Sequence, residues 1–229
     1  MAKGARAEAM AANRAKLVQT ARRAFATQGY AAASMDDFTA AAGLTRGALY
    51  HSFGDKKGLL GAVTEQIDAE MALRLKAVRE RAGSVWEGLL DEAAAYIEMA
   101  LEPEIQRIML LDGPAVLGDP STWPGQNACL EVTTRTIRTL IEEGVVPSLD
   151  AEAAARLLNG AALSAALWVA AAADPPAVLG KATQAFRRLA AGLLRDTDGP
   201  DAVQGGAQAT PCRGVPIKRR TAPPRRAPR

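Results

Sequence analysis

The stretch SMDDFTAAAGLTRGALYHSF, from Ser34 to Phe53, decides the fold. Ser34 can cap a helix that begins at Met35, because its hydroxyl can accept a backbone N–H of the first turn. Gly43 can adopt the left-handed conformation that ends a helix, and Thr45 can cap a second one. Two short helices joined by a tight turn form a helix-turn-helix, whose second helix is free to enter the major groove of DNA.

The outer side of this motif carries the residue types that bind phosphates and base edges. Ala48 and Leu49 lie on the inner side of the second helix, so its polar residues remain outside. Asp55 can cap a following helix and place a lysine at its positive end, where phosphate is favoured. The predicted DNA-binding residues are Ser34, Thr45, Arg46, Gly47, Tyr50, His51 and Lys56. In a different fold, His51 could instead be a core histidine.

A longer stretch, LVQTARRAFATQGYAAASMDDFTAAAGLTRGALYHSFGDKKGLLGAV from Leu17 to Val63, resembles the N-terminal domain of TetR/AcrR-type transcriptional regulators. The segment MLLDGPAVLGDPSTW, from Met109 to Trp123, is also similar to one in the ligand-binding halves of some members. The resemblance implies an all-α protein, in which a three-helix helix-turn-helix domain precedes a larger helical domain for ligand binding and dimerisation. It also implies a ligand-responsive repressor, released from a palindromic DNA operator by a small apolar molecule.

The resemblance implies a flexible N-terminus (1–10), a DNA-binding domain (11–71) and a ligand-binding and dimerisation domain (72–196), and the change of composition from Thr197 marks a disordered basic tail (197–229). The tail has almost no large apolar residue and cannot bury enough surface to offset its ordering entropy. Its arginines and lysine could add nonspecific DNA affinity through counterion release, or only keep the chain soluble.

Helical periodicity predicts the elements, and no segment reads as a strand. A first helix is expected over Asn13 to Gln28, and a fourth continues from the motif toward Arg81. The stretch from Gly113 to Gly125, which is rich in proline and glycine, is expected to be a loop. Two long apolar helices should close the fold, one capped by Asp150 and running through Ala173, the other opening at Pro175.

Charge is distributed unevenly along the chain. Residues 1–60 hold nine basic and four acidic side chains, a net +5, whereas residues 61–196 hold 12 basic and 19 acidic ones, a net −7. Residues 197–229 return to +5, with seven basic and two acidic side chains. An acidic middle segment repels polyanions, so their binding is expected at the two basic ends of the chain. The alternative interpretation is that the negative charge of the middle segment only keeps the protein soluble.

The chain reads as a cytoplasmic protein. The nearly continuous apolar run from Ala161 to Ala173 is too short to span a bilayer, and no signal peptide is evident. Cys129 and Cys212 have no metal-ligand spacing, which fits a reducing compartment.

Enzyme chemistry is not expected. His51 is the only histidine, which excludes a histidine-based triad and a multi-histidine metal site. No phosphate-binding glycine motif follows a strand, and scattered carboxylates on helices are usually a solvated face. We therefore expect no catalytic residues, no metal and no cofactor.

The family resemblance implies three kinds of partner: an operator in double-stranded DNA, a second copy of the chain, and an unidentified small molecule. Candidates for the ligand pocket are the large aromatic or flexible residues Trp86, Tyr96, Met99, Met109, Trp123 and Trp168. Candidates for a four-helix dimer interface are Gly160, Leu163, Leu167, Leu179, Phe186, Leu189 and Leu193.

Two alternatives remain open. Any of these apolar residues could be ordinary core, and the last two helices could fill only a monomer. A protein that binds DNA or partners without a ligand response is the other class of function, which a fully packed C-terminal core would favour and an internal cavity would not.

Overall fold

The computed structural model describes residues 2–195, and within this range every regular element is helical. The segment 197–229, expected to be a basic tail, lies outside the described residues. The α-helices are α1 (Ala2–Ala32), α2 (Met35–Ala42), α3 (Arg46–Phe53), α4 (Lys56–Arg81), α5 (Val85–Glu98), α6 (Gly113–Leu117), α7 (Pro124–Glu142), α8 (Ala151–Ala171) and α9 (Pro175–Ala191). Short 3₁₀ turns η1 (Met99–Leu101) and η3 (Pro120–Thr122) and a π-helix, η2 (Ile105–Asp112), connect them.

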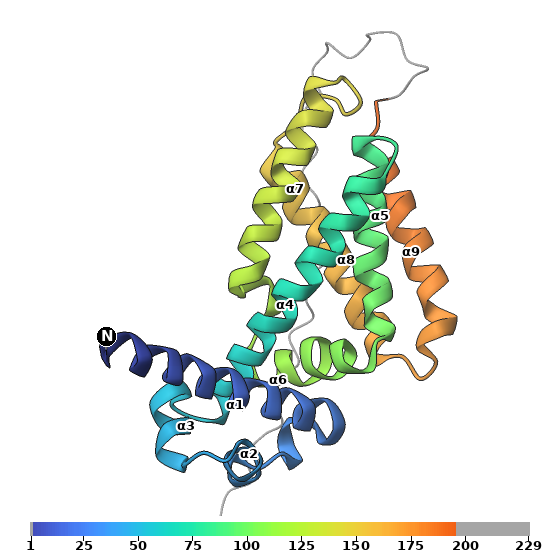
Figure 1. The fold of residues 1–229 in the computed structure, drawn as a ribbon. Helices are drawn as coiled ribbons and strands as arrows, with labels where there is room; N and C mark the ends of the chain where they lie inside the picture. Colours follow the sequence, from blue (N-terminus) through green and yellow to red (C-terminus); the bar gives the residue numbers. More distant parts are fainter. Residues whose placement is uncertain (1, 196–229) are drawn as a thin grey trace, which may run out of the picture. The chain divides into compact units, whose positions relative to one another are not determined.

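Helices α1, α2 and α3 cluster around the beginning of α4 (Figure 1). Their shared core contains the fully buried side chains of Phe25 from α1, Phe38 from α2, Leu49 from α3 and Leu60 from α4. The rings of Phe25 and Phe38 meet edge to face with centroids 5.4 Å apart, a favourable aromatic geometry. This core fixes the angle at which α3 is presented to solvent.

The predicted local signals of the helix-turn-helix are confirmed. Helix α2 begins at Met35, with the Ser34 hydroxyl accepting the Asp36 N–H. Gly43 ends α2 in the left-handed region, with a φ of 66°. Asp55 caps α4, which continues without a break to Arg81, as expected.

The first helix is longer than predicted. Helix α1 begins at Ala2 rather than Asn13, so the segment expected to be flexible is helical. The amphipathic pattern missed this part because residues 4–12 are all exposed and carry no apolar face. Alanine, arginine, glutamate and methionine are strong helix formers, which extends the helix without tertiary contacts.

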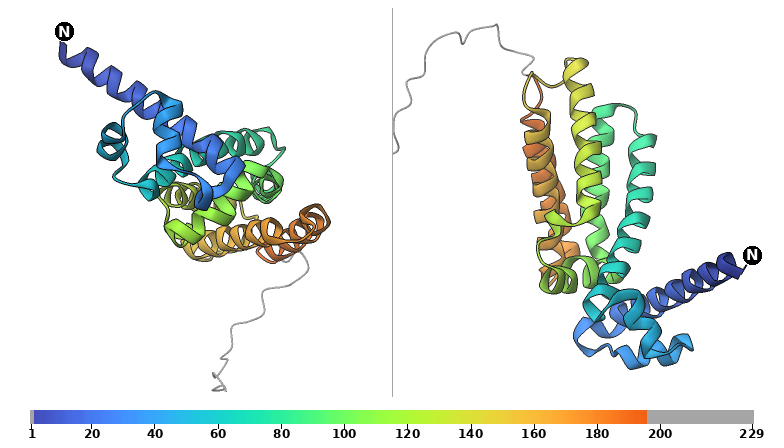
Figure 2. Two further views of the ribbon diagram at one scale, coloured as in Figure 1. Left: turned by 90° about the horizontal axis from the view of Figure 1, so that it is seen from below. Right: turned by 90° about the vertical axis from the view of Figure 1, so that its left-hand side faces the viewer.

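Helices α4, α5, α7, α8 and α9 lie side by side as a bundle (Figures 1 and 2). Fully or nearly fully buried side chains fill its interior, including Ile97 from α5, Leu140 from α7, Ala166 from α8 and Phe186 from α9. Small alanines on α8 allow its neighbours to approach closely, so this helix lies among α5, α7 and α9.

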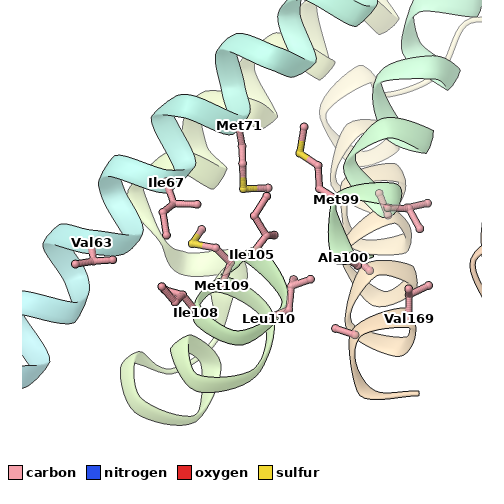
Figure 3. Packing of buried hydrophobic residues seen from close by; sticks show 14 of the residues in the cluster. Val63, Ile67, Met71, Met99, Ala100, Ile105, Ile108, Met109, Leu110 and Val169 are labelled. Atoms are coloured by element: carbon pink, nitrogen blue, oxygen red, sulfur yellow. The ribbon is translucent and has the colours of Figure 1, made fainter. Parts of the chain in front are cut away.

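A second packing layer joins the two clusters. Figure 3 shows Ile67 and Met71 of α4 pointing toward Ile105 and Met109 of η2. All four side chains are at most 6% exposed. The layer makes α4 a member of both cores, because its first turns bury Leu60 in the N-terminal cluster.

The stretch expected to be a loop, from Gly113 to Gly125, is largely helical. It contains α6 and η3, and α7 already begins at Pro124. The prediction was wrong because prolines were counted as breakers. Pro114, Pro120 and Pro124 all lie in the first turn of an element, where proline's missing N–H has no intrahelical partner to lose.

Helix α8 changes the expectation about membranes. Within the described residues, it is the one helix long and apolar enough to cross a bilayer by length and composition. It begins at Ala151, ten residues before the apolar run noted in the sequence, and ends at Ala171 rather than Ala173. Its first turns carry Glu152 and Arg156, paired at 2.7 Å, and one side packs into the bundle. A buried core helix passes the same test, so this is weak evidence for a membrane span.

We predict that truncating the buried face of α4 destabilises the protein strongly, whereas truncating its exposed face does not. Leu60→Ala removes a fully buried side chain and should lower the free energy of unfolding by about 2–5 kcal/mol. Leu73, on the same helix, is 70% exposed, and Leu73→Ala should change it by less than about 0.5 kcal/mol. Urea denaturation measures both. Equal losses would show that the two faces of α4 are assigned wrongly.

Candidate nucleic-acid interface and internal cavity

One side-chain cap and one buried leucine hold α3 in place. The Thr45 hydroxyl accepts the Ala48 N–H at 3.2 Å, at the start of the helix. Leu49 is fully buried on its inner side. The opposite side of α3 is therefore rigidly presented to solvent, which suits a surface that binds another macromolecule.

The structure brings most of the predicted DNA-binding residues together on this exposed side. Thr45, Arg46, Gly47, Tyr50 and His51 are all exposed, and Tyr50 retains 54% of its free surface. Ser34 is half-buried at the start of α2, and its hydroxyl is engaged in capping.

The guanidinium of Arg46 is paired with the carboxylate of Asp36 from α2. Both side chains are more than half exposed, so the pair is weak and can open when a stronger anion is present. Sequence reasoning placed Asp36 only as a favourable charge at the start of its helix. The contact between the two helices could not be read from the local pattern.

Lys56 is held by α1 instead of extending freely into solvent. Its Nζ lies 4.5 Å from the centroid of the Tyr30 ring and donates to the Ala31 carbonyl at 3.3 Å. The half-buried ammonium would have to leave these contacts to reach a phosphate. Its neighbour Lys57 is exposed.

Arg22 of α1 links the helix-turn-helix to the rest of the protein. Its guanidinium donates to both carboxylate oxygens of Glu70 on α4, at 2.7 and 2.8 Å. It also donates to both oxygens of Glu104, which immediately precedes η2, at 2.7 Å each. The hydrogen bonds that Arg22 donates to Glu70 lower the pKa of this carboxylate.

A second link lies at the end of α1. The backbone N–H of Tyr30 donates to a carboxylate oxygen of Asp112, the last residue of η2, at 2.8 Å. Gly29, next to it, has a φ of 79°, and a Cβ there would come within 2.7 Å of the Arg107 guanidinium. A side chain at this position would be strained by the left-handed backbone and would require the Arg107 guanidinium to move.

A cavity of about 760 Å³ lies along α4 and α7, with α5 contributing to one wall. Its volume is in the range of small-molecule sites. The apolar part of its lining includes Met71, Leu75, Leu117, Trp123 and Val132.

Only some of the predicted pocket residues reach this cavity. Tyr96 and Trp123 line it. Met99 and Met109 are buried in the core, and Trp86 packs against the core from α5. Trp168 does not line the cavity, contrary to the prediction. It lies on the outer side of α8 and is 52% exposed, because the alanines of that helix occupy its inward positions.

The cavity also contains charged groups that the sequence did not single out. Arg79 of α4 donates to both carboxylate oxygens of Glu92 on α5, at 2.5 and 2.7 Å. Asp68 of α4 makes no hydrogen bond or ion pair with any residue that the structure describes. Removal from water raises its pKa. Removal from water also raises the pKa of the Tyr96 hydroxyl. The nearby Cys129 and Asp68 raise it further, because a negative charge on either disfavours the tyrosinate.

The predicted dimer residues differ in exposure. Leu189 is 62% exposed, and Gly160 is exposed as well. Four leucines are half-buried, namely Leu163, Leu167, Leu179 and Leu193. Phe186 is only 5% exposed and belongs to the core of the single chain. The structure adds Leu157, 75% exposed, and Trp168 to the apolar surface of α8.

No group of three side chains suited to hold a metal ion occurs in residues 2–195.

Two family models match the chain. The N-terminal model, for bacterial regulatory proteins of the TetR family, covers residues 17–63. The C-terminal model, a tetracycline repressor-like domain, covers residues 86–193.

The chain is also similar to proteins from several organisms. A TetR-family transcriptional regulator from Pectobacterium atrosepticum is 52% identical, with a TM-score of 0.76 over 82% of this chain and 96% of that one. The transcriptional repressor AcnR of Corynebacterium glutamicum is 34% identical over 44% of this chain and 52% of the relative. The chain thus spans about half of the length of AcnR. RolR, solved with resorcinol, shares the fold, with a TM-score of 0.61 at 20% identity.

The N-terminal model covers the helix-turn-helix cluster and the C-terminal model the bundle, and the Pectobacterium regulator is matched over nearly its whole length. This is a class of DNA-binding regulators and not of enzymes. The protein belongs to the TetR family of bacterial transcriptional regulators.

Proposed function

We propose that the protein is a dimeric repressor that binds a palindromic DNA operator and releases it when a small molecule enters the cavity along α4. The observation that carries the proposal is the course of α4. This one helix has its first turns in the core beneath α3 and its middle in the wall of the cavity.

DNA binding is supported by the chemistry of the exposed side of α3. Arg46 can donate two parallel hydrogen bonds to a guanine edge, while Tyr50 and His51 offer donors to phosphates. The backbone at Gly47 can approach DNA closely because no side chain intervenes. Repression is supported by the names of AcnR and its relatives.

A dimer is supported by the apolar surface of α8 and α9. Leu157, Trp168 and Leu189 are each more than half exposed. Exposed large apolar side chains on adjacent helices are typical of a protein interface. Two copies related by a two-fold axis could place their α3 helices in successive major grooves, about 34 Å apart.

A ligand response is supported by the cavity itself and by the links from α1 to α4 and η2. A ligand that binds one conformation of α4 more tightly shifts the population toward it. RolR, which shares the fold, was solved with resorcinol. The alternative, a DNA-binding or interaction protein without a ligand response, would fit a fully packed C-terminal core better than an open cavity.

We predict that Arg46→Ala weakens operator binding by about 10–100-fold and relaxes base preference at one position of each half-site. Tyr50→Ala should weaken binding to all sequences about equally, because a phosphate contact carries no sequence information. The operator would be recovered by sequencing DNA that co-purifies from the native host, and affinities measured by fluorescence anisotropy at one salt concentration.

Arg138→Ala is the matched control for Arg46→Ala. Arg138 is an exposed arginine of α7, and its replacement removes the same single positive charge. Operator affinity equal to wild type in the Arg46 and Tyr50 variants, with folding intact, would reject α3 as the DNA-binding helix.

We predict that the double variant Leu157→Glu with Leu189→Glu is a folded monomer with little operator affinity. Both side chains are exposed in the single chain, so glutamates there should spare its core but become unpaired charges in an apolar interface. Analytical ultracentrifugation gives the mass. Leu73→Glu, at an exposed position of α4, should leave the dimer intact, and a dimeric double variant would place the interface elsewhere.

A further inference from the structure

We propose that the cavity is selective for organic cations, and that Asp68 pairs with the positively charged nitrogen of a ligand whose apolar body fills the rest of the space. The inference rests on the proposed role of the cavity as an effector site and names the chemical class of the effector.

Two carboxylates at the cavity, Asp68 and Glu65, have no ion-pair partner among residues 2–195, and of the two only Asp68 is partly withdrawn from water. Arg79 is already neutralised by Glu92, with which it forms two short hydrogen bonds. Lys76 faces Glu80 at 3.6 Å, and both of these side chains are more than half exposed. Among residues 2–195, Asp68 makes no ion pair and accepts no hydrogen bond, and removal from water is the cause of its raised pKa.

Leaving a carboxylate unpaired away from water is costly, and proteins pair such groups. The surroundings of Asp68 disfavour its charged form, since removal from water raises its pKa. A ligand ammonium would supply the missing partner. A carboxylate ligand would instead meet Asp68 as a like charge.

Asp68 of α4 also contacts the neighbouring helix α7. The carboxylate lies against the backbone of Gly125 in the first turn of α7, where a Cβ would come within 1.5 Å of Oδ2. The N-terminus of α7 favours a negative charge there in general. No backbone N–H among the described residues donates to Asp68, however, so the helix end leaves its hydrogen-bonding capacity unused.

The remaining walls suit an apolar body. Met71 and Leu75 come from α4, Leu117 from α6, and Val132 from α7. Trp123 adds an aromatic side chain, a surface to which cations and apolar rings both bind. The Tyr96 hydroxyl, whose pKa is raised, stays protonated at neutral pH and can donate to a polar atom of the ligand.

The test uses three probes with the same ring system and different charge: 1-naphthylmethylamine, 1-naphthalenemethanol and 1-naphthoic acid. Binding to the full-length protein is measured by calorimetry at pH 7.5. The amine should bind more tightly than the alcohol, by about tenfold or more. Its ammonium can form a charge-assisted hydrogen bond with the Asp68 carboxylate, which is stronger than a hydrogen bond from a neutral hydroxyl. The acid should bind most weakly.

Asp68→Asn should remove this preference by weakening the amine about tenfold or more, while leaving the alcohol within about threefold of wild type. Glu65→Gln is the matched control, because Glu65 is another carboxylate of α4 at the cavity but is exposed to water. It should leave all three affinities nearly unchanged. Gly125→Ala keeps the charge but displaces it, and should weaken the amine selectively.

The outcomes separate this inference from the proposed function. An amine that binds no better than the alcohol, or an Asp68→Asn variant that keeps the preference, would overturn the cation assignment and leave the cavity as an effector site. Failure of all three probes to bind wild-type protein would count against both.

Thermal unfolding provides an independent check on Asp68. The pKa of this group is raised in the folded state, so the penalty for its ionisation is fully present at pH values above that pKa, fades as the pH falls from it toward the unfolded value, and is absent below the unfolded value. Asp68→Asn should therefore raise the melting temperature at pH 7.5, and the increase should be smaller at pH 4. A lower melting temperature at pH 7.5 would show that Asp68 already has a stabilising partner.

Discussion

The guanidinium of Arg22 holds together the parts of the molecule that the proposed function requires. It is only 15% exposed and reaches two carboxylates, Glu70 on α4 and Glu104 before η2. Without it, these two carboxylates would lose their common partner. The cost of breaking such a partly buried network usually exceeds the gain from forming it. The orientation of α1 therefore depends on where α4 and η2 lie.

This dependence gives α4 its importance. The helix buries Leu60 beneath α3 and Met71 against η2, and it carries Asp68 into the cavity. A ligand that displaces the middle of α4 would move Glu70, one of the two carboxylates that Arg22 binds, and would act on the support of α3. Coupling of this kind requires two arrangements with different ligand affinity, and the packed layer between α4 and η2 is a place where they can differ.

Local sequence signals predicted the helix-turn-helix because the contacts that define it are local. Ser34, Thr45 and Asp55 each cap a helix within three residues of themselves, and Gly43 ends one by its own conformation. The cavity was harder to predict, because Asp68 and Gly125 meet only once α4 and α7 pack. Trp168 was misplaced for the same reason, since periodicity finds an apolar residue without showing which neighbour covers it.

The most direct test of the link through Arg22 is the operator affinity with and without saturating 1-naphthylmethylamine, in wild type and in Arg22→Met, with folding checked by thermal unfolding. Wild type should lose about 5–150-fold in operator affinity when the amine is bound, the usual range for coupled sites. Arg22→Met should bind the amine normally but show a clearly smaller loss. An equal loss in both proteins would contradict the account, because the cavity would then act on α3 without the contact between α1, α4 and η2.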